Sequence, residues 1–287
     1  MRLTAMRSLL LSAIILCFAS ASLQAEPVRT PHTEAELVSE TLSLEPGKSA
    51  WIALRLNSKK GWHTYWRYAG DSGLPTTIAW QLPPGFKAGS IQWPMPERFK
   101  LGPLLNYGYH GEVLLLTKIE TPAKQPISTN VTLRAKANWL ACEKICVPEQ
   151  AELSLTLPVE NTKPATDKRW YPKFEQTRKN TPQQFSGVTA FQVQGKQLSV
   201  TLKLPNMKLG EIRDAEFFPH RFGVISHAAS QTWAVTPDGV VMRLTAGPLV
   251  NEKMREITGT VRLSFKVGEK TLNKSYDVSA AHQDTAL

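Results

Sequence analysis

The chain has 287 residues, with 34 Lys and Arg against 24 Asp and Glu, and a formal net charge of +10. The basic residues are spread along the sequence in short groups and form no basic stripe with interleaved aromatic residues. This charge pattern argues against a nucleic-acid-binding protein. At about 100–200 residues per domain, the length predicts two domains.

The amino-terminal segment, residues 1–25, is predicted to be a secretory signal peptide. Basic residues precede an apolar run at 9–19, and small residues follow, which places cleavage after Ala21 or Ala25. The run is shorter than the ~18–20 residues of a membrane helix, and no comparable run follows it. We therefore expect a periplasmic chain with no transmembrane helix after cleavage; an uncleaved anchor is the alternative. Cys17 lies in the segment that would be removed.

Alternation of apolar and polar residues with a period of two dominates the first half of the remaining sequence. The clearest alternating segments are 49–56, 131–139 and 152–157. Turns rich in Pro and Gly separate such segments, at 45–47, 82–85 and 93–96. Half-buried antiparallel strands joined by turns of this kind predict a β-sandwich over residues 26–160.

The alternation stops between 161 and 184, which reads as a linker. A short helix is expected at 167–179, because Trp170 and Phe174 lie one turn apart, although Pro172 obscures where it starts.

Alternation resumes at 198–204, 240–244 and 261–267, so residues 185–280 are predicted to form a second all-β domain. The tail at 281–287 is expected to be loose. The expected fold class is all-β, with two sandwich domains in tandem and a short helical linker.

Cys142 and Cys146 are the only cysteines beyond the signal segment. In a straight strand their Cα atoms would lie ~13 Å apart. A disulfide needs ~7 Å or less, so the chain must reverse between them if they pair. The preceding strand points Trp139 inward, and its phase turns Cys142 to the other face.

A bridge across so short a loop stabilises the fold by only about 2 kcal/mol, against about 4.7 kcal/mol for a loop of ~100 residues. Stability is therefore a weak reason for this pair. A short, accessible bridge suits thiol–disulfide exchange. Two alternatives stay open: a structural disulfide, and a Cu(I) site completed by His63, His110 or Met95.

Several further motifs occur in the same order as in a known family. They are residues 61–66 (GWHTYW), 70–75 (GDSGLP), 93–96 (WPMP), 107–111 (YGYHG), 142–149 (CEKICVPE), 217–219 (FFP) and 225–229 (ISHAA). On these motifs the chain resembles the amino-terminal periplasmic domain of the thiol:disulfide interchange protein DsbD, and more closely that of the copper-sensitivity suppressor ScsB.

The resemblance implies two immunoglobulin-like sandwiches, with the redox pair in the first. It implies an electron relay in which Cys142 and Cys146 exchange with periplasmic thioredoxin-fold or other thiol proteins, as a component of a protein-disulfide reductase system. No cofactor or metal is implied. Four residues are candidate neighbours of the pair: Tyr107, Tyr109, His110 and Asp71. Which cysteine attacks stays open.

The sequence departs from the family pattern in three ways. The chain ends at Leu287 without the family's membrane electron-transfer and thioredoxin-like domains, so we expect a separate membrane protein to supply electrons. Tyr68 and Ala69 replace an expected Asn-Pro, and DsbD has a longer gap between its cysteines.

The predicted function is periplasmic thiol–disulfide exchange, with copper tolerance as its setting. The alternative is a non-enzymatic binding module for copper or for a protein, with a structural disulfide.

Overall fold

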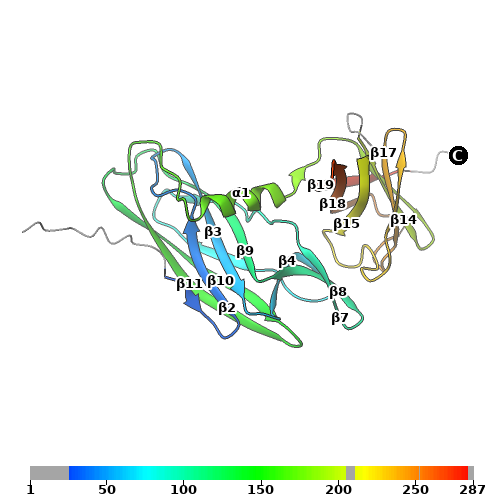
Figure 1. Ribbon diagram of the computed structural model, residues 1–287, viewed down its shortest axis with the longest axis horizontal. Coiled ribbons are helices and arrows are strands. Elements are labelled where there is room, and N and C mark those ends of the chain that lie inside the picture. The colour runs from blue at the N-terminus through cyan, green and yellow to red at the C-terminus, as the bar shows by residue number, and fades with distance from the viewer. Residues whose placement is uncertain (1–25, 205–210, 252, 284–287) are drawn as a thin grey trace, which may run out of the picture.

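The computed structural model describes residues 26–204, 211–251 and 253–283. The predicted signal peptide lies outside these residues. Two β-sandwiches lie side by side, and the helix α1 (Tyr171–Asn180) connects them (Figure 1). Within the described ranges, no helix is both long enough and apolar enough to cross a membrane. The fold class expected from the sequence is confirmed.

The first sandwich consists of two sheets that enclose one apolar core. The first sheet contains, in spatial order, β1 (Val28–Arg29), β2 (Thr33–Ser39), β3 (Ser49–Ser58), β9 (Glu112–Glu120) and β6 (Lys87–Ala88). The second contains β11 (Cys146–Pro158), β10 (Asn130–Cys142), β4 (His63–Gly70), β8 (Leu104–His110) and β7 (Glu97–Leu101), while β5 (Thr77–Gln81) also pairs with β10. The three alternating segments of this half coincide with β3, β10 and β11.

The second sandwich is built from one curled sheet around its own core. Its strands are, in spatial order, β15 (Ile212–Pro219), β18 (Glu256–Val267), β19 (Lys270–His282), β13 (Thr189–Gln194), β14 (Gln197–Lys203), β17 (Gly239–Thr245) and β16 (Thr232–Thr236), and β12 (Gln183–Gln184) pairs with β19. The final strand continues past residue 280, because Ala281 and His282 pair in parallel with Ala190 and Phe191. This part of the expected loose tail is therefore ordered backbone.

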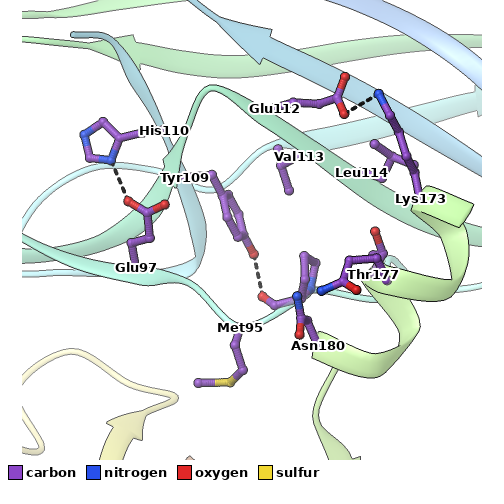
Figure 2. Close-up of a pocket in the computed structure, with 12 residues that line it drawn as sticks. Met95, Glu97, Tyr109, His110, Glu112, Val113, Leu114, Lys173, Thr177 and Asn180 are labelled. Carbon is purple, nitrogen blue, oxygen red and sulfur yellow. Dashed lines mark hydrogen bonds and ion pairs between the residues drawn. The ribbon is translucent and has the colours of Figure 1, made fainter. Parts of the chain in front are cut away.

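The helix α1 packs on the outer face of the first sheet (Figure 1). Trp170 and Phe174 join a small core with side chains of β2, β3 and β9. Pro172 lies in the first turn, where a missing N–H leaves no intrahelical bond unmade. The end of the helix is tied to the loop before β7, since the Met95 N–H donates to the Asn180 carbonyl oxygen at 2.8 Å. A pocket of about 290 Å³ lies between this loop and the helix (Figure 2).

The strands β4 and β8 carry the contact between the sandwiches. Phe218 of β15 belongs to the core of the first sandwich, with its ring 6.1 Å from Trp66 and 5.1 Å from Tyr107. Beside it, the Arg67 guanidinium donates to the Asp277 carboxylate at 2.5 Å. The strand β4 also pairs with β10 at Cys142, so the interface and the hairpin that carries the cysteines share structural elements.

Candidate functional site

The cysteines close a β-hairpin. The strands β10 and β11 pair antiparallel along their whole length, and Cys142 opposite Cys146 is the last pair before the turn. The turn holds only residues 143–145, with the Glu143 N–H bonded to the Ile145 carbonyl oxygen. The two Cα atoms lie 4.2 Å apart and the sulfurs form a disulfide. The chain therefore reverses between the cysteines, as their pairing requires.

The two cysteines differ sharply in exposure. Cys142 is 0% exposed, whereas Cys146 is exposed at the hairpin tip. Ala141 belongs to the core of the sandwich, and Cys142 follows it in the strand, so its side chain points to the opposite face. Only one end of the bridge is thus open to an approaching molecule.

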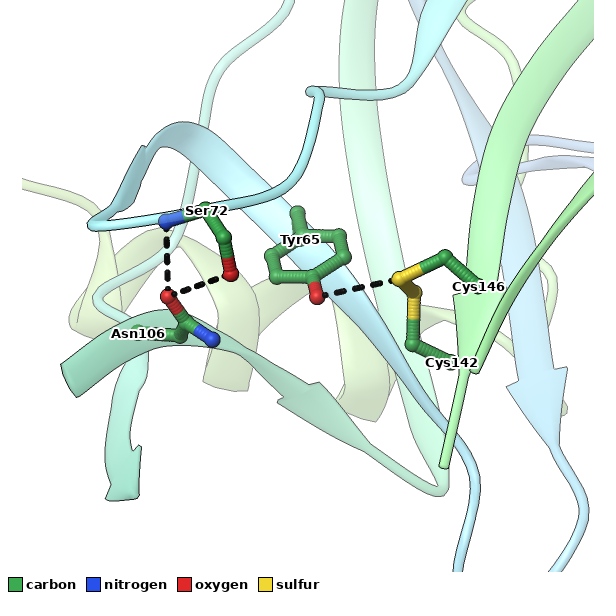
Figure 3. Close-up of a disulfide and its surroundings, with 5 residues drawn as sticks. All are labelled: Tyr65, Ser72, Asn106, Cys142 and Cys146. Carbon is green, nitrogen blue, oxygen red and sulfur yellow. Dashed lines mark hydrogen bonds between the residues drawn. A yellow bond between two sulfur atoms is a disulfide. The ribbon is translucent and has the colours of Figure 1, made fainter. Parts of the chain in front are cut away.

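Tyr65 on β4 contacts the exposed end of the bridge. Its hydroxyl lies 3.5 Å from the Cys146 Sγ, and it must donate, because a disulfide sulfur carries no proton (Figure 3). Burial raises the pKa of the Tyr65 phenol, which keeps this donor protonated at neutral pH.

The loop of residues 70–73 packs over Tyr65. Gly73 has a φ of 104°, and a Cβ there would lie 2.4 Å from the tyrosine ring, so only glycine fits. The Asn106 side chain accepts a bond from the Ser72 N–H at 3.0 Å (Figure 3). The Asp71 carboxylate accepts one from the Leu105 N–H at 2.8 Å. Asp71, one of the four candidate neighbours, thus holds this loop against β8.

His63 is the immediate cross-strand neighbour of Cys142. It pairs with Cys142 on one side and with His110 on the other. Directly paired residues present their side chains on the same face. His63 is only 3% exposed, and its Nε2 has no hydrogen-bond partner. Burial, with a smaller effect of His110, lowers the pKa of His63 to about 4.

An aromatic group surrounds this imidazole. The ring centroids of Phe99, Tyr65 and His110 lie 4.3, 5.2 and 5.3 Å from that of His63. The His110 Nδ1 lies 2.9 Å from a carboxylate oxygen of Glu97 (Figure 2). His110, a candidate neighbour, is thus joined to the bridge through His63.

Tyr107 and Tyr109, the other two candidates, lie on the opposite face of β8, in the core of the sandwich. The Tyr107 hydroxyl is 3.0 Å from the Nδ1 of His227 in the second sandwich. The Tyr109 hydroxyl donates to the Pro94 carbonyl oxygen at 2.7 Å (Figure 2). The structure does not place either beside the sulfurs. His63 and Tyr65, which are not among the four candidates, take that place.

Glu149 anchors the hairpin behind the bridge. Its carboxylate accepts bonds from the Thr30 hydroxyl, the His32 N–H and the Trp139 Nε1–H. Although burial opposes it, the bonds from Thr30 and His32 hold the pKa of Glu149 below its usual value. Trp139 and Glu149 are also paired across the ladder, so the network fixes the register that brings the cysteines together.

A family model matches the part of the chain that contains this site. Residues 34–158 match the model described as thiol:disulfide interchange protein DsbD, N-terminal. Residues 34–158 belong to the DsbD N-terminal family. In a search of curated proteins, none matches the chain.

The likeness to solved structures extends over both sandwiches. The N-terminal periplasmic domain of ScsB from Proteus mirabilis superposes with a TM-score of 0.62 at 15% identity, covering 89% of this chain and 97% of that one. This match confirms the fold of the DsbD-type domain together with the second sandwich. The YadV chaperone, at 10% identity, covers 85% of this chain and 100% of that one. Its TM-score of 0.22 is too low to argue from.

The described residues offer few side chains that could bind a metal ion together. Among the described residues, no three His, Cys, Asp or Glu side chains are grouped so that they could hold a metal ion. The two sulfurs, the best Cu(I) ligands of the chain, are tied up in their bridge.

Proposed function

We propose that the chain is a periplasmic thiol–disulfide exchange protein, in which the Cys142–Cys146 pair passes electrons to other thiol proteins. The observation that carries this proposal is the asymmetric bridge at the hairpin tip, with one sulfur exposed and one buried. Membership of residues 34–158 in the DsbD N-terminal family supports it.

The asymmetry assigns roles to the two cysteines. In the reduced protein the exposed Cys146 attacks the disulfide of a partner, and a mixed disulfide forms between Cys146 and that partner. The buried Cys142 then attacks the Cys146 sulfur, restores the internal bridge and releases the reduced partner. Electrons enter by the reverse sequence, from a thiol reductant such as a separate membrane electron-transfer protein.

An apolar surface beside the hairpin favours a protein as the partner. A pocket of about 530 Å³ is lined by Leu74, Pro75, Leu140 and Pro148 and adjoins the redox turn. Leu74 is 64% exposed, and Ile145 within the turn is 70% exposed. Exposed apolar residues grouped next to a reactive sulfur are typical of a surface that binds another protein.

The reduction potential of the bridge tests the proposal first. Equilibration with glutathione followed by thiol alkylation should give a value between roughly −180 and −270 mV, the range of disulfide oxidoreductases. A potential below about −300 mV would mean a bridge that resists reduction. The chain would then be a binding module with a structural disulfide.

Single cysteine variants test the assignment of roles. Cys142→Ser keeps the exposed thiol but cannot resolve the intermediate, so it should trap mixed disulfides with periplasmic thiol proteins on non-reducing gels. Cys146→Ser keeps only the buried thiol and should trap few or none. Equal trapping by both variants would contradict the assignment, and full exchange activity in both would refute the relay.

A further inference from the structure

A buried histidine with an unsatisfied nitrogen lies next to the buried cysteine. His63 is 3% exposed, and its Nε2 has no partner although it is shielded from water. An unpaired buried polar atom costs about 1–3 kcal/mol, so its presence needs a reason. The oxidised bridge offers this nitrogen no proton, whereas a reduced Cys142 would.

The sheet places four side chains in a lateral row. The register runs Cys146–Cys142 between β11 and β10, Cys142–His63 between β10 and β4, and His63–His110 between β4 and β8. Directly opposed residues have Cβ atoms about 4.5–5.5 Å apart, within reach of a thiol and an imidazole. The contact of Tyr65 with the Cys146 Sγ fixes the face, because Tyr65 and His63 share a side of β4 and their rings touch.

The exchange reaction needs a proton acceptor at this place. A thiol buried in apolar surroundings resists ionisation, yet only the thiolate attacks a disulfide. Cys142 must therefore lose its proton before it can resolve the mixed disulfide on Cys146. The acceptor has to be neutral at working pH and lie inside the protein, and the depressed pKa of His63 keeps its imidazole neutral.

We infer that His63 accepts the proton of the Cys142 thiol in the resolving step, which makes the buried cysteine a competent nucleophile. This inference rests on the proposed function. It extends that function by naming the residue that handles the proton.

The Cys142 S–H bond breaks and its proton passes to His63, which becomes an imidazolium beside the new thiolate. The thiolate attacks the Cys146 sulfur, the bond from Cys146 to the partner breaks, and its electron pair leaves on the partner sulfur, which is protonated from solvent. Over both steps the dithiol is oxidised by two electrons and the partner's disulfide is reduced to two thiols.

Burial and His110 disfavour a lone positive charge on His63, so the imidazolium depends on the new thiolate beside it. The titratable or charged groups that face His63 or adjoin it are Tyr65 on its own strand, His110 on β8, Glu97 on β7 and Glu143 in the redox turn, which lies against Gly61. Glu97 is bonded to His110, whose side chain is 40% exposed. This pair connects the buried imidazole to solvent, where the proton can leave.

Dithiobis-nitrobenzoate, a small aromatic disulfide, separates the two cysteines in one experiment. The reduced protein should release thionitrobenzoate in two phases, followed by absorbance in a stopped-flow instrument. The first phase reports attack by Cys146, and the second reports displacement by Cys142. The Cys142→Ser variant identifies the phases, because it keeps the first and lacks the second.

Replacement of His63 should affect the second phase alone. His63→Phe keeps an aromatic ring against Phe99 and Tyr65, and His63→Gln keeps a hydrogen-bonding group that cannot carry the proton. In both, the second phase at pH 7 should slow by about a hundredfold or more, while the first phase is unchanged. The pH at which the rate of the second phase is half-maximal should rise. His227→Gln is the matched control, since His227 is also 3% exposed with an unpartnered Nε2 but contacts Tyr107. It should leave both phases at the wild-type rate.

Two outcomes would overturn the inference. One is a second phase at the wild-type rate in both His63 variants between about pH 5 and 9. The other is equal slowing of both phases, which would assign His63 a structural role only. Either result, together with normal trapping by Cys142→Ser, leaves the proposed function intact. A second phase that depends on His63, without trapping of any protein, would refute the relay and keep the assignment of His63.

Discussion

The neutral, buried imidazole of His63 makes the stability of the first sandwich depend on pH. Its pKa is about 4 when folded and about 6.5 when unfolded, so the unfolded state binds more protons between these values. Stability should therefore fall as the pH drops from about 6.5 to about 4. The loss should be on the order of 3 kcal/mol if His63 acts alone.

Urea denaturation at pH 7 and at pH 4.5 measures this loss, and His63→Phe provides the comparison. The variant has no group to protonate at this position, so its stability should fall less than that of the wild type over the same interval. The comparison also cancels the contributions of His220 and His227, whose pKa values burial likewise lowers. An identical pH dependence in both proteins would contradict the neutral state of His63.

Parity along a strand decides which aromatic residues reach the sulfurs. His63 and Tyr65 share one face of β4, while Tyr107 and Tyr109 share the inner face of β8. Alternation indicates which residues share a face, but not which strand lies beside Cys142. The neighbour of Cys142 is set by the cross-strand pair of residues 63 and 142, which are 79 positions apart in sequence. A local sequence pattern cannot predict a pair so far apart.

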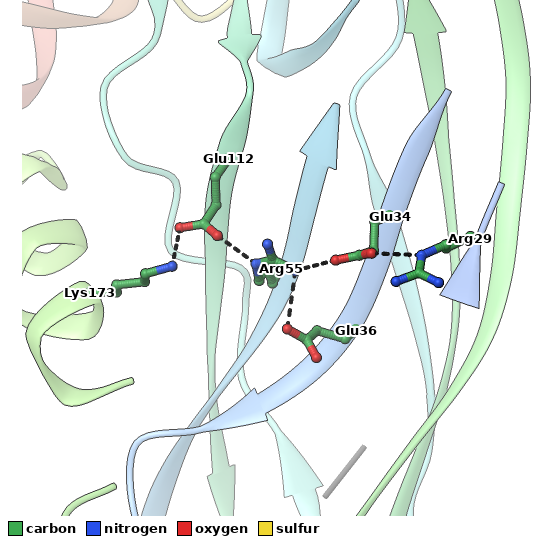
Figure 4. A network of polar contacts seen from close by, with 6 residues as sticks. All are labelled: Arg29, Glu34, Glu36, Arg55, Glu112 and Lys173. Carbon is green, nitrogen blue, oxygen red and sulfur yellow. Dashed lines mark hydrogen bonds and ion pairs between the residues drawn. The ribbon is translucent and has the colours of Figure 1, made fainter. Parts of the chain in front are cut away.

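At the scale of elements, the docked helix α1 is held by its apolar side chains, with a charged network at the edge. Lys173 and Arg55 both bind the Glu112 carboxylate at 2.6 Å, and Arg55 reaches on to Glu34 (Figure 4). Although burial opposes it, these bonds lower the pKa of Glu112. Ion pairs of half-exposed side chains contribute little, so we expect the buried aromatic contacts to dominate.

Phe174→Ala tests this expectation. Phe174 is 0% exposed, and its removal should lower the free energy of unfolding by about 3–5 kcal/mol in urea titrations. Lys173→Ala, on the same helix, should cost less than about 1 kcal/mol. Equal effects of the two substitutions would mean that charge, rather than burial, holds the helix.

The sequence predicts some elements far better than others. Strands with one face in the core, such as β3, β10 and β18, alternate clearly and were predicted from that pattern. The strand β4 begins with four consecutive buried residues, 63–66, because the core covers one face and the ring of Phe99 covers the other. Its alternation is therefore hidden. The short strand β7 is half-exposed and has no pattern to detect.

At the scale of the whole molecule, the two sandwiches share part of one core. Phe218 is 0% exposed and belongs to the second sandwich by sequence, but its ring packs with Trp66 and Tyr107 of the first. Burial of a large aromatic side chain couples the stability of the parts it joins. We therefore expect the two sandwiches to unfold together, although separate domains were predicted.

Phe218→Ala should weaken both sandwiches, with a loss of about 3–5 kcal/mol. Hydrogen–deuterium exchange read by mass spectrometry reports each part separately, through β9 in the first and β17 in the second. Phe191→Ala is the control, because Phe191 is 1% exposed in the second core only, and its effect should be confined to β17 and its neighbours. Unchanged protection of β9 in Phe218→Ala would contradict the coupling.

The cysteines are the last opposed pair of a ladder that continues without a break through β10 and β11. Reduction of the disulfide releases no segment of backbone, because the ladder hydrogen bonds and the bonds to Glu149 already hold the hairpin tip closed. Oxidised and reduced forms should then have nearly the same shape. Because the oxidised and reduced forms would have the same surface shape, a partner protein should bind both, and the two forms should compete for the same site on that partner. In the proposed relay, the direction of electron flow would then be set by the difference in potential and by the relative concentrations of the two forms.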